Sequence, residues 1–197
     1  MLKLRKAAIT GGLACGKSSV CQIFKQLGAY VVSADEVVHQ NLSQNKKLIR
    51  EVEDLLGPDI LSGGSIDRKV VADKVFHRPE LLKELEKLIH PVVEKEIEDQ
   101  FQKLQKEGKT GLIIAEIPVL FESGLPLSFF DTIIVVTAPD SLCRERFKGT
   151  DGDYERRKAL QIPLEEKVKQ ADYVIVNDKD RKHLSEQVTE LYQTLKL

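Results

Sequence analysis

A short glycine-containing segment, residues 11–18, constrains the fold of this chain more than any other part of the sequence. Gly11, Gly16, Lys17 and Ser18 occupy the four fixed positions of the nucleotide-binding pattern G-x-x-x-x-G-K-[ST]. An apolar segment precedes the pattern and a segment with helical spacing follows it, which predicts a loop between a strand and a helix. In such a loop, backbone N–H groups surround a β-phosphate, the lysine reaches the β- and γ-phosphate oxygens, and the serine hydroxyl binds Mg²⁺. The predicted nucleotide contacts are Gly11, Gly12, Leu13, Ala14, Cys15, Gly16, Lys17, Ser18 and Ser19.

Two variable positions of the loop carry uncommon residues. Ala14 enters left-handed backbone conformations less readily than glycine does, but it replaces none of the fixed residues. Cys15 lies beside Lys17 and a predicted helix N-terminus, so it is either a thiol with a lowered pKa or an inert small residue. We therefore expect an intact phosphate loop.

Five short apolar segments predict the strands of a parallel sheet. They are continuously apolar rather than alternating, which is typical of strands covered on both faces. Segments with helical spacing separate them, so we expect an α/β P-loop NTPase fold with a five-stranded parallel sheet flanked by helices. The predicted strands are residues 7–10, 29–32, 112–117, 132–137 and 173–176.

The interval between the second and third predicted strands is too long for a single crossover helix. It reads almost entirely as helices, one of which begins at Pro79 and ends at Pro91. We predict one kinase domain with a helical acceptor-binding subdomain at residues 35–107, and a lid at residues 144–161 that is dense in charge and glycine. The core is expected at residues 1–34, 108–143 and 162–197.

Composition narrows the possible partners. Thirty Lys and Arg residues against 31 Asp and Glu residues leave a net charge of -1, so no overall positive field favours nucleic acid or an anionic membrane. The three cysteines have no C-x-x-C spacing, and no apolar stretch is long enough to cross a membrane. We expect a cytoplasmic protein that binds a small molecule, with no evident protein, nucleic-acid or membrane partner.

Phosphate loops serve switches, motors and kinases. A GTPase needs N-K-x-D, and residues 177–180 read N-D-K-D, which disfavours a switch. A small kinase needs the loop, a helical insertion and an arginine-bearing lid, and the sequence has them in that order. Asp35 follows a predicted strand and is either the group that activates the acceptor hydroxyl or a helix cap, while Glu116 is a candidate for binding Mg²⁺ or its water shell.

The chain resembles the dephospho-CoA kinase family along nearly its whole length. The similar segments are TGGLACGKS at 10–18, FKQLGAYVVSAD at 24–35, Ile66-Asp67-Arg68, Ile89-His90-Pro91, PVLFESGL at 118–125, and a final pattern with Arg157, Gln161, Pro163, Lys167, Ala171-Asp172, Val174-Ile175 and Asn177. The order of PVLFESGL, IHP and the final pattern is specific, whereas the phosphate loop is shared by many families.

This resemblance implies a reaction and a set of roles. It implies ATP-dependent phosphorylation of the ribose 3′-hydroxyl of dephospho-CoA, with Asp35 as the acceptor-activating aspartate and Arg68 and His90 as candidate acceptor contacts. Arg146 is our choice for the γ-phosphate arginine, although Arg144 is not distinguished from it. Arg157 and Asn177 are further candidate nucleotide contacts, alongside Lys17 as a catalytic cation, while Ser18 and Glu116 are the candidate Mg²⁺ ligands. A nucleoside monophosphate kinase remains the alternative.

The sequence departs from the family pattern at two places. Ser33 stands where the family often has a first aspartate, which leaves Asp35 as the carboxylate there, and Ala14-Cys15 replaces a Gly-Ser pair.

Overall fold

The computed structural model describes residues 4–76 and 78–196, which fall into two compact units. The sheet unit contains the chain up to Ser33 and from Gln100 onward, and the helical unit is Ala34–Asp99. Helix α5 (Pro79–Lys106) contributes residues to both units.

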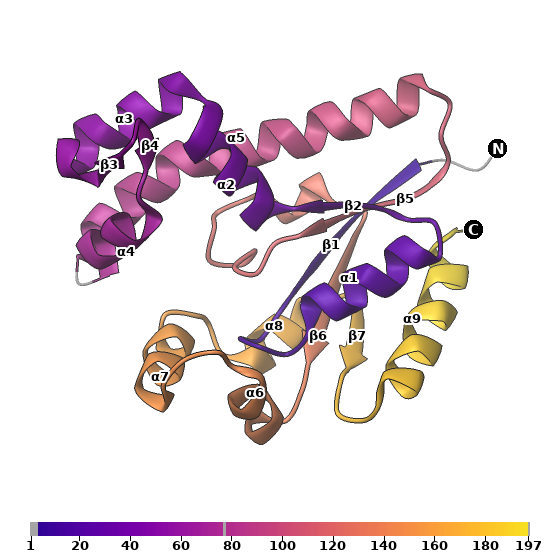
Figure 1. The fold of residues 1–197 in the computed structure, drawn as a ribbon. Helices are drawn as coiled ribbons and strands as arrows, with labels where there is room; N and C mark the ends of the chain where they lie inside the picture. Colours follow the sequence, from indigo (N-terminus) through magenta and orange to yellow (C-terminus); the bar gives the residue numbers. More distant parts are fainter. Residues whose placement is uncertain (1–3, 77, 197) are drawn as a thin grey trace. The chain divides into compact units, whose positions relative to one another are not determined.

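A five-stranded sheet forms the centre of the sheet unit (Figure 1). Its order is β2-β5-β1-β6-β7, every neighbouring pair is parallel, and the register places Ile9 opposite Glu116 and Gly11 opposite Val136. The strands are β1 (Leu4–Gly11), β2 (Tyr30–Ser33), β5 (Gly111–Glu116), β6 (Thr132–Thr137) and β7 (Tyr173–Val176). All five predicted strands and the predicted fold class are confirmed.

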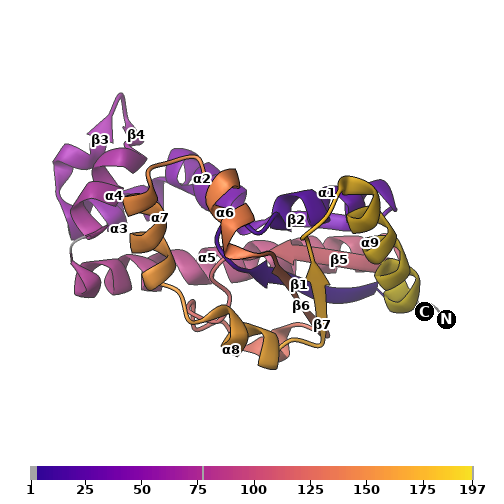
Figure 2. The ribbon, with the colours of Figure 1, turned by 90° about the horizontal axis from the view of Figure 1, so that it is seen from below.

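Helices cover this sheet and supply its core. Helices α1 (Lys17–Gln26) and α9 (Arg181–Lys196) run side by side along it (Figure 2). The rings of Phe24 and Tyr192, one from each helix, meet edge to face with their centroids 6.4 Å apart. The chain after β6 forms three short helices, α6 (Asp140–Arg146), α7 (Asp151–Ala159) and α8 (Leu164–Lys169). Because β1, β5 and β6 are buried along most of their length, the loops at their carboxyl ends have a rigid base.

The helical unit has a hydrophobic core of its own. It contains α2 (Ala34–Gln44), α3 (Lys46–Leu56), a 3₁₀ turn η1 (Pro58–Ile60), the hairpin strands β3 (Leu61–Ser62) and β4 (Ser65–Ile66), and α4 (Arg68–Phe76). Leu48, Val52 and Leu56 form the buried stripe of α3, and Asn45 caps that helix by accepting a hydrogen bond from the Leu48 backbone N–H.

The structure corrects two details of the sequence interpretation. The prediction that a helix ends at Pro91 is wrong, because α5 continues through this proline. A proline inside a helix removes one backbone hydrogen bond, but the buried positions Leu85, Val93 and Ile97 keep helical spacing across it, and their packing holds the helix together. The hairpin was not predicted, although Gly63 and Gly64, both with positive φ, are the residue type that such a tight turn requires.

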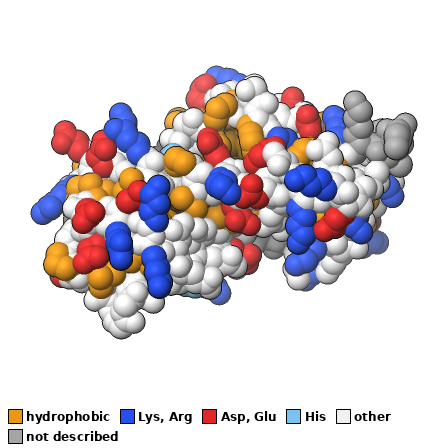
Figure 3. Space-filling model, turned by 90° about the horizontal axis from the view of Figure 1, so that it is seen from above, with side chains coloured by type: hydrophobic (Ala, Val, Ile, Leu, Met, Phe, Trp, Pro, Cys, Tyr) orange, Lys and Arg blue, Asp and Glu red, His pale blue; other side chains and the backbone are white. Residues whose placement is uncertain are grey.

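Charge of both signs is mixed on one face of the molecule. Acidic and basic side chains are interspersed over the face drawn in Figure 3. Among the helices that the structure describes, none has the length and apolar character needed to cross a membrane.

Candidate functional site

The loop between β1 and α1 is shaped by two glycines at points of close approach. Gly11 has φ 146°, and a Cβ there would lie 2.1 Å from the Val136 carbonyl oxygen. Gly16 has φ 93° as the residue that precedes α1, and a Cβ there would lie 2.2 Å from Asn177 Nδ2. The loop therefore needs glycine at both fixed positions for sterics as well as for backbone conformation.

Two side chains form hydrogen bonds with backbone carbonyl groups of the loop, Lys17 and Asn177. Lys17 is 9% exposed, and its Nζ donates to the Gly12 carbonyl oxygen at 2.7 Å. Asn177, just after β7, donates from Nδ2 to the Cys15 carbonyl oxygen at 2.9 Å. Asn177, predicted as a nucleotide contact, thus supports the middle of the loop. The Lys17 ammonium lies against the loop backbone.

Two side-chain oxygens meet where the loop enters α1, one from Ser18 and one from Glu116 at the end of β5. Ser18 Oγ donates a 2.7 Å hydrogen bond to Glu116 Oε1, and Glu116 ends β5 opposite Ile9 of β1. A hydroxyl and a carboxylate at this spacing are ligand types that Mg²⁺ accepts, with water and phosphate oxygens completing its shell. No cluster of three or more metal-ligating side chains occurs among residues 4–76 and 78–196.

The two arginines of α6 have different partners. Arg144 binds two carboxylates, donating from Nε to Asp140 at 2.7 Å and from Nη2 to Glu155, and its guanidinium lies over the Tyr154 ring. Arg146 donates from Nη1 to the Asn177 carbonyl oxygen at 3.1 Å. The structure therefore brings Arg146 next to the residue that supports the phosphate loop, while Arg144 fastens α6 to α7. Arg157 is exposed, with its guanidinium 5.8 Å from the centre of the Phe147 ring.

Asp140 is the shared partner of three side chains in this segment, although no motif in the sequence pointed to it. It accepts hydrogen bonds from Lys158, Arg144 and Tyr154. The Lys158 ammonium, with the other two donors, holds the pKa of the Asp140 carboxyl well below its usual range. Its place at the start of α6 was visible in the sequence, but its partner Lys158, 18 residues further on, was not.

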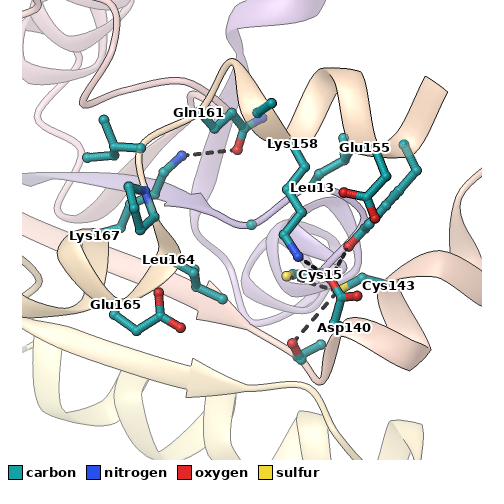
Figure 4. Close-up of a pocket in the computed structure, with 16 residues that line it drawn as sticks. Leu13, Cys15, Asp140, Cys143, Glu155, Lys158, Gln161, Leu164, Glu165 and Lys167 are labelled. Atoms are coloured by element: carbon teal, nitrogen blue, oxygen red, sulfur yellow. Dashed lines mark hydrogen bonds and ion pairs between the residues drawn. The ribbon is translucent and has the colours of Figure 1, made fainter. Parts of the chain in front are cut away.

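A cavity of about 700 Å³ lies beside the phosphate loop (Figure 4). Gly12, Leu13 and Cys15 line it from the loop, and the remaining lining comes from Ala138 before α6, from α6, α7 and α8, and from the residues before α8. Lys167 of α8 is 1% exposed, and its Nζ contacts Glu122 Oε1 at 2.8 Å and Gln161 Oε1 at 3.1 Å. This buried ion pair joins α8 to the loop after β5. Both residues belong to motifs quoted above, but nothing in the sequence paired them.

Three predicted site residues belong to the helical unit. Asp35 is exposed in the first turn of α2, two positions after Ser33, which pairs with Glu116 at the carboxyl end of β2. Arg68, at the start of α4, has Nη1 3.4 Å from His39 Nδ1. His90 is half-buried within α5. The structure thus pairs Arg68 with His39, a residue that sequence reasoning missed because 29 positions separate the two.

Known proteins resemble this chain over its full length. A family model described as dephospho-CoA kinase matches residues 6–183. A protein named dephospho-CoA kinase from Protochlamydia amoebophila is 48% identical, and the match covers 100% of this chain and 99% of that protein. Among solved structures, dephospho-CoA kinase from Campylobacter jejuni matches with a TM-score of 0.73 at 30% identity, over 98% of each chain. A crystal structure from Thermus thermophilus matches with a TM-score of 0.81 at 29% identity, also over 98% of each chain.

Proposed function

Because this chain belongs to the dephospho-CoA kinase family, we propose that it phosphorylates the ribose 3′-hydroxyl of 3′-dephospho-CoA with ATP, forming coenzyme A and ADP. The observation that carries the proposal is the 48% identity to a protein of that name along the entire chain. Shared length and identity favour this acceptor over a nucleoside monophosphate. We place the enzyme in a reducing cytoplasm, because its three cysteines have no spacing that is typical of a disulfide framework.

The residues around the phosphate loop suit the donor nucleotide. We assign the backbone of residues 11–19 to the phosphates, with Lys17 neutralising the transferred γ-phosphoryl group. Arg146 is the better of the two α6 arginines for the same charge, because two carboxylates hold Arg144 whereas Arg146 reaches the carbonyl beside the loop. Asn177 supports the loop through its side chain, and Arg157 is an additional cation for the lid.

Ser18 and Glu116 fit a Mg²⁺ site. Their oxygens are 2.7 Å apart at the carboxyl edge of the sheet, and both are hard ligands. Bound there, the ion would neutralise developing charge on the phosphate oxygens. Glu116 orients the Ser18 side chain by accepting a hydrogen bond from its hydroxyl group.

We assign binding of the acceptor to residues of the helical unit. We assign Asp35 to orient the ribose hydroxyl and accept its proton, since its exposed carboxylate follows directly on a strand whose carboxyl end pairs with Glu116. Arg68 and His90 are the proposed contacts for the acceptor, and His39 joins Arg68 in this role.

An acceptor assay combined with one substitution tests the proposal. ADP release is measured with dephospho-CoA, AMP, CMP and UMP in parallel, and only dephospho-CoA is expected to support turnover. Asp35→Asn should keep ATP binding and lower kcat by roughly 10²–10⁴-fold, because the hydroxyl loses its base. Glu36→Gln removes the neighbouring carboxylate of the same helical turn and is the matched control, with kcat expected to stay near that of the wild type.

Two outcomes would contradict these assignments. Faster turnover with a nucleoside monophosphate than with dephospho-CoA would make the protein a different kinase. Asp35→Asn turnover within a few-fold of wild type would reduce Asp35 to a helix-terminal residue.

A further inference from the structure

Two cysteine thiols from distant parts of the sequence meet beside the phosphate loop. Cys15 belongs to the loop and Cys143 to α6, and their sulfur atoms lie 3.2 Å apart (Figure 4). Both residues are free thiols, and both line the cavity of about 700 Å³. Two thiols in contact need only a small approach, to about 2 Å between the sulfurs, to form a disulfide. We propose that a peroxide converts Cys15 and Cys143 into a reversible disulfide, and that this bond switches off phosphoryl transfer.

The two thiols differ in reactivity in the way that such a reaction needs. The hydrogen bond with Cys143, together with the Lys17 charge and against the effect of burial, lowers the pKa of the Cys15 thiol. The same contact and burial raise the pKa of Cys143. Cys15 is therefore the nucleophile and Cys143 the resolving thiol.

The third cysteine behaves differently. Burial and the nearby Glu116 carboxylate raise the pKa of Cys21. Cys21 lies on α1 and is not among the residues that line the cavity. All three thiols are at most 3% exposed, so a small peroxide reaches them only from a cavity. Cys15 and Cys143 line the cavity and Cys21 does not, which makes Cys21 an internal control.

The oxidation balances with one peroxide molecule. The Cys15 thiolate attacks one peroxide oxygen, the O–O bond breaks, and Cys15 becomes a sulfenic acid while the other oxygen leaves as water after protonation. The Cys143 sulfur then attacks the Cys15 sulfur, the S–O bond breaks, and the hydroxyl group leaves as a second water with the Cys143 proton. Two thiols are oxidised by two electrons and the peroxide is reduced to two waters.

A Cys15–Cys143 disulfide would link the two segments that we place around the γ-phosphate, the phosphate loop and α6. Cys15 lies between Ala14 and Gly16, both with positive φ, and its carbonyl oxygen is held by Asn177. Its Sγ also lies 2.5 Å from the place that a Cβ on Gly12 would occupy. Closing the gap between the sulfurs must therefore displace this tightly packed loop or α6, which carries Arg146. Displacements near 1 Å in a phosphate-transfer site lower turnover by roughly 10²-fold.

The experiment follows bond formation and activity separately. The reduced full-length protein is treated with increasing hydrogen peroxide, the remaining thiols are alkylated, and the intact mass and tryptic peptides are measured. We expect a protein lighter by two hydrogen atoms, one alkylated thiol at Cys21, and a peptide cross-linked between Cys15 and Cys143. Turnover should fall by roughly 10²-fold in proportion to the cross-linked fraction, and dithiothreitol should restore it.

Two substitutions separate the pair from a general oxidation. Cys143→Ser retains a small polar side chain next to the Ala138 carbonyl oxygen and should keep basal turnover, yet with peroxide it gains oxygen at Cys15 and forms no cross-link. Cys21→Ser should cross-link and lose activity as the wild type does.

The outcomes test the two halves of the inference independently of the proposed acceptor. Absence of the cross-linked peptide at peroxide doses that oxidise Cys15 overturns the disulfide. A cross-linked protein with full turnover and unchanged ATP binding overturns the switch. The effect on turnover rests on the proposed function. If that function fails, the reduced protein does not phosphorylate dephospho-CoA, whereas peroxide treatment still forms the cross-link.

Discussion

The cavity beside the phosphate loop has two walls that are held together by different forces. On one side, the loop and α8 are fastened by buried groups: the amide of Asn177 on the Cys15 carbonyl, and the Lys167–Glu122 ion pair. On the other side, α6 and α7 are joined by Asp140 and its donors, whose charged side chains are one-third to one-half exposed. Lys167, by contrast, is 1% exposed.

This difference indicates how the two walls behave. Buried polar groups that lose a partner leave an unsatisfied atom in a medium of low dielectric, so they are costly to separate. Exposed ion pairs are screened by water and salt and contribute little to stability. We call the phosphate loop together with α8 the fixed wall. Cys143 and Tyr154 pack α6 and α7 into the hydrophobic core, but the polar contacts between these two helices are the exposed ones. We therefore propose that α6 and α7, which carry Arg146 and Arg157, form the moving wall.

The largest expected effect comes from disturbing the fixed wall at Gly16. In Gly16→Ala, the alanine is strained because the backbone at this position is left-handed. Its Cβ also displaces the Asn177 amide from the Cys15 carbonyl. We expect a loss of about 2–5 kcal/mol in the free energy of unfolding, the sum of backbone strain and a broken buried hydrogen bond. Turnover should fall by at least roughly 10²-fold, because the loop no longer positions the phosphates. Urea unfolding and ATP titration measure the two effects.

Gly64→Ala separates the strain from the contact. Gly64 has φ 82°, and no atom lies within 4 Å of the place that a Cβ would occupy, so this variant should lose only about 1–2 kcal/mol and keep full turnover. Equal losses of activity in both variants would mean that the Asn177 contact has no role.

The backbone conformation of the fixed wall could be predicted from the sequence, but its side-chain contacts could not. The loop lies where the spacing of Gly11, Gly16 and Lys17 predicts it, because local sterics and the strand–helix context determine that conformation. Asn177 was chosen as a nucleotide contact from a motif, but its bond to the Cys15 carbonyl depends on β7 lying beside β6 in the sheet. Contacts between segments so far apart follow from topology, which local patterns do not encode.

The next effect compares one charged side chain from each wall. Lys167→Met leaves the Glu122 carboxylate without its cation, and we expect the free energy of unfolding to fall by about 3 kcal/mol. Lys158→Met removes an exposed partner of Asp140 and should cost less than about 1 kcal/mol. Urea unfolding at low and high salt measures both losses. The difference in free energy of unfolding between the wild type and Lys158→Met should shrink at high salt, whereas the difference for Lys167→Met should not.

A double variant checks the reason for the larger loss. Lys167→Met combined with Glu122→Gln removes the unpaired charge and keeps an amide oxygen for the Ile162 backbone N–H. It should recover part of the lost stability, because the new amide NH2 takes the place of Glu122 Oε2, which is buried and has no hydrogen-bond partner among the described residues. If the double variant is as unstable as Lys167→Met, then packing of the lysine side chain, rather than charge, holds this wall.

The moving wall was the part that sequence reasoning described least well. The pattern placed arginines in a lid but left Arg144 and Arg146 equivalent, since both lie in the last turn of α6. Their roles diverge only because Asp140 and Glu155 surround Arg144 while Arg146 faces the end of β7. The Cys15–Cys143 contact is the same kind of case, because the two thiols are 128 residues apart and neither has a local signal for the other.

The smallest effect concerns the uncommon residue in the loop itself. Ala14 has φ 57° and is the sole non-glycine residue with positive φ in the described part of the chain. Ala14→Gly removes a left-handed strain of about 1–2 kcal/mol but adds about 0.5–1 kcal/mol of chain entropy in the unfolded state. We expect a net gain below about 1 kcal/mol in the free energy of unfolding, with turnover nearly unchanged. Ala14→Val is the opposite test, since a β-branched residue is strained at this φ and should destabilise the loop. A loss of stability in Ala14→Gly would mean that packing of the alanine methyl group outweighs its backbone strain, and the fixed wall would then owe part of its rigidity to that side chain.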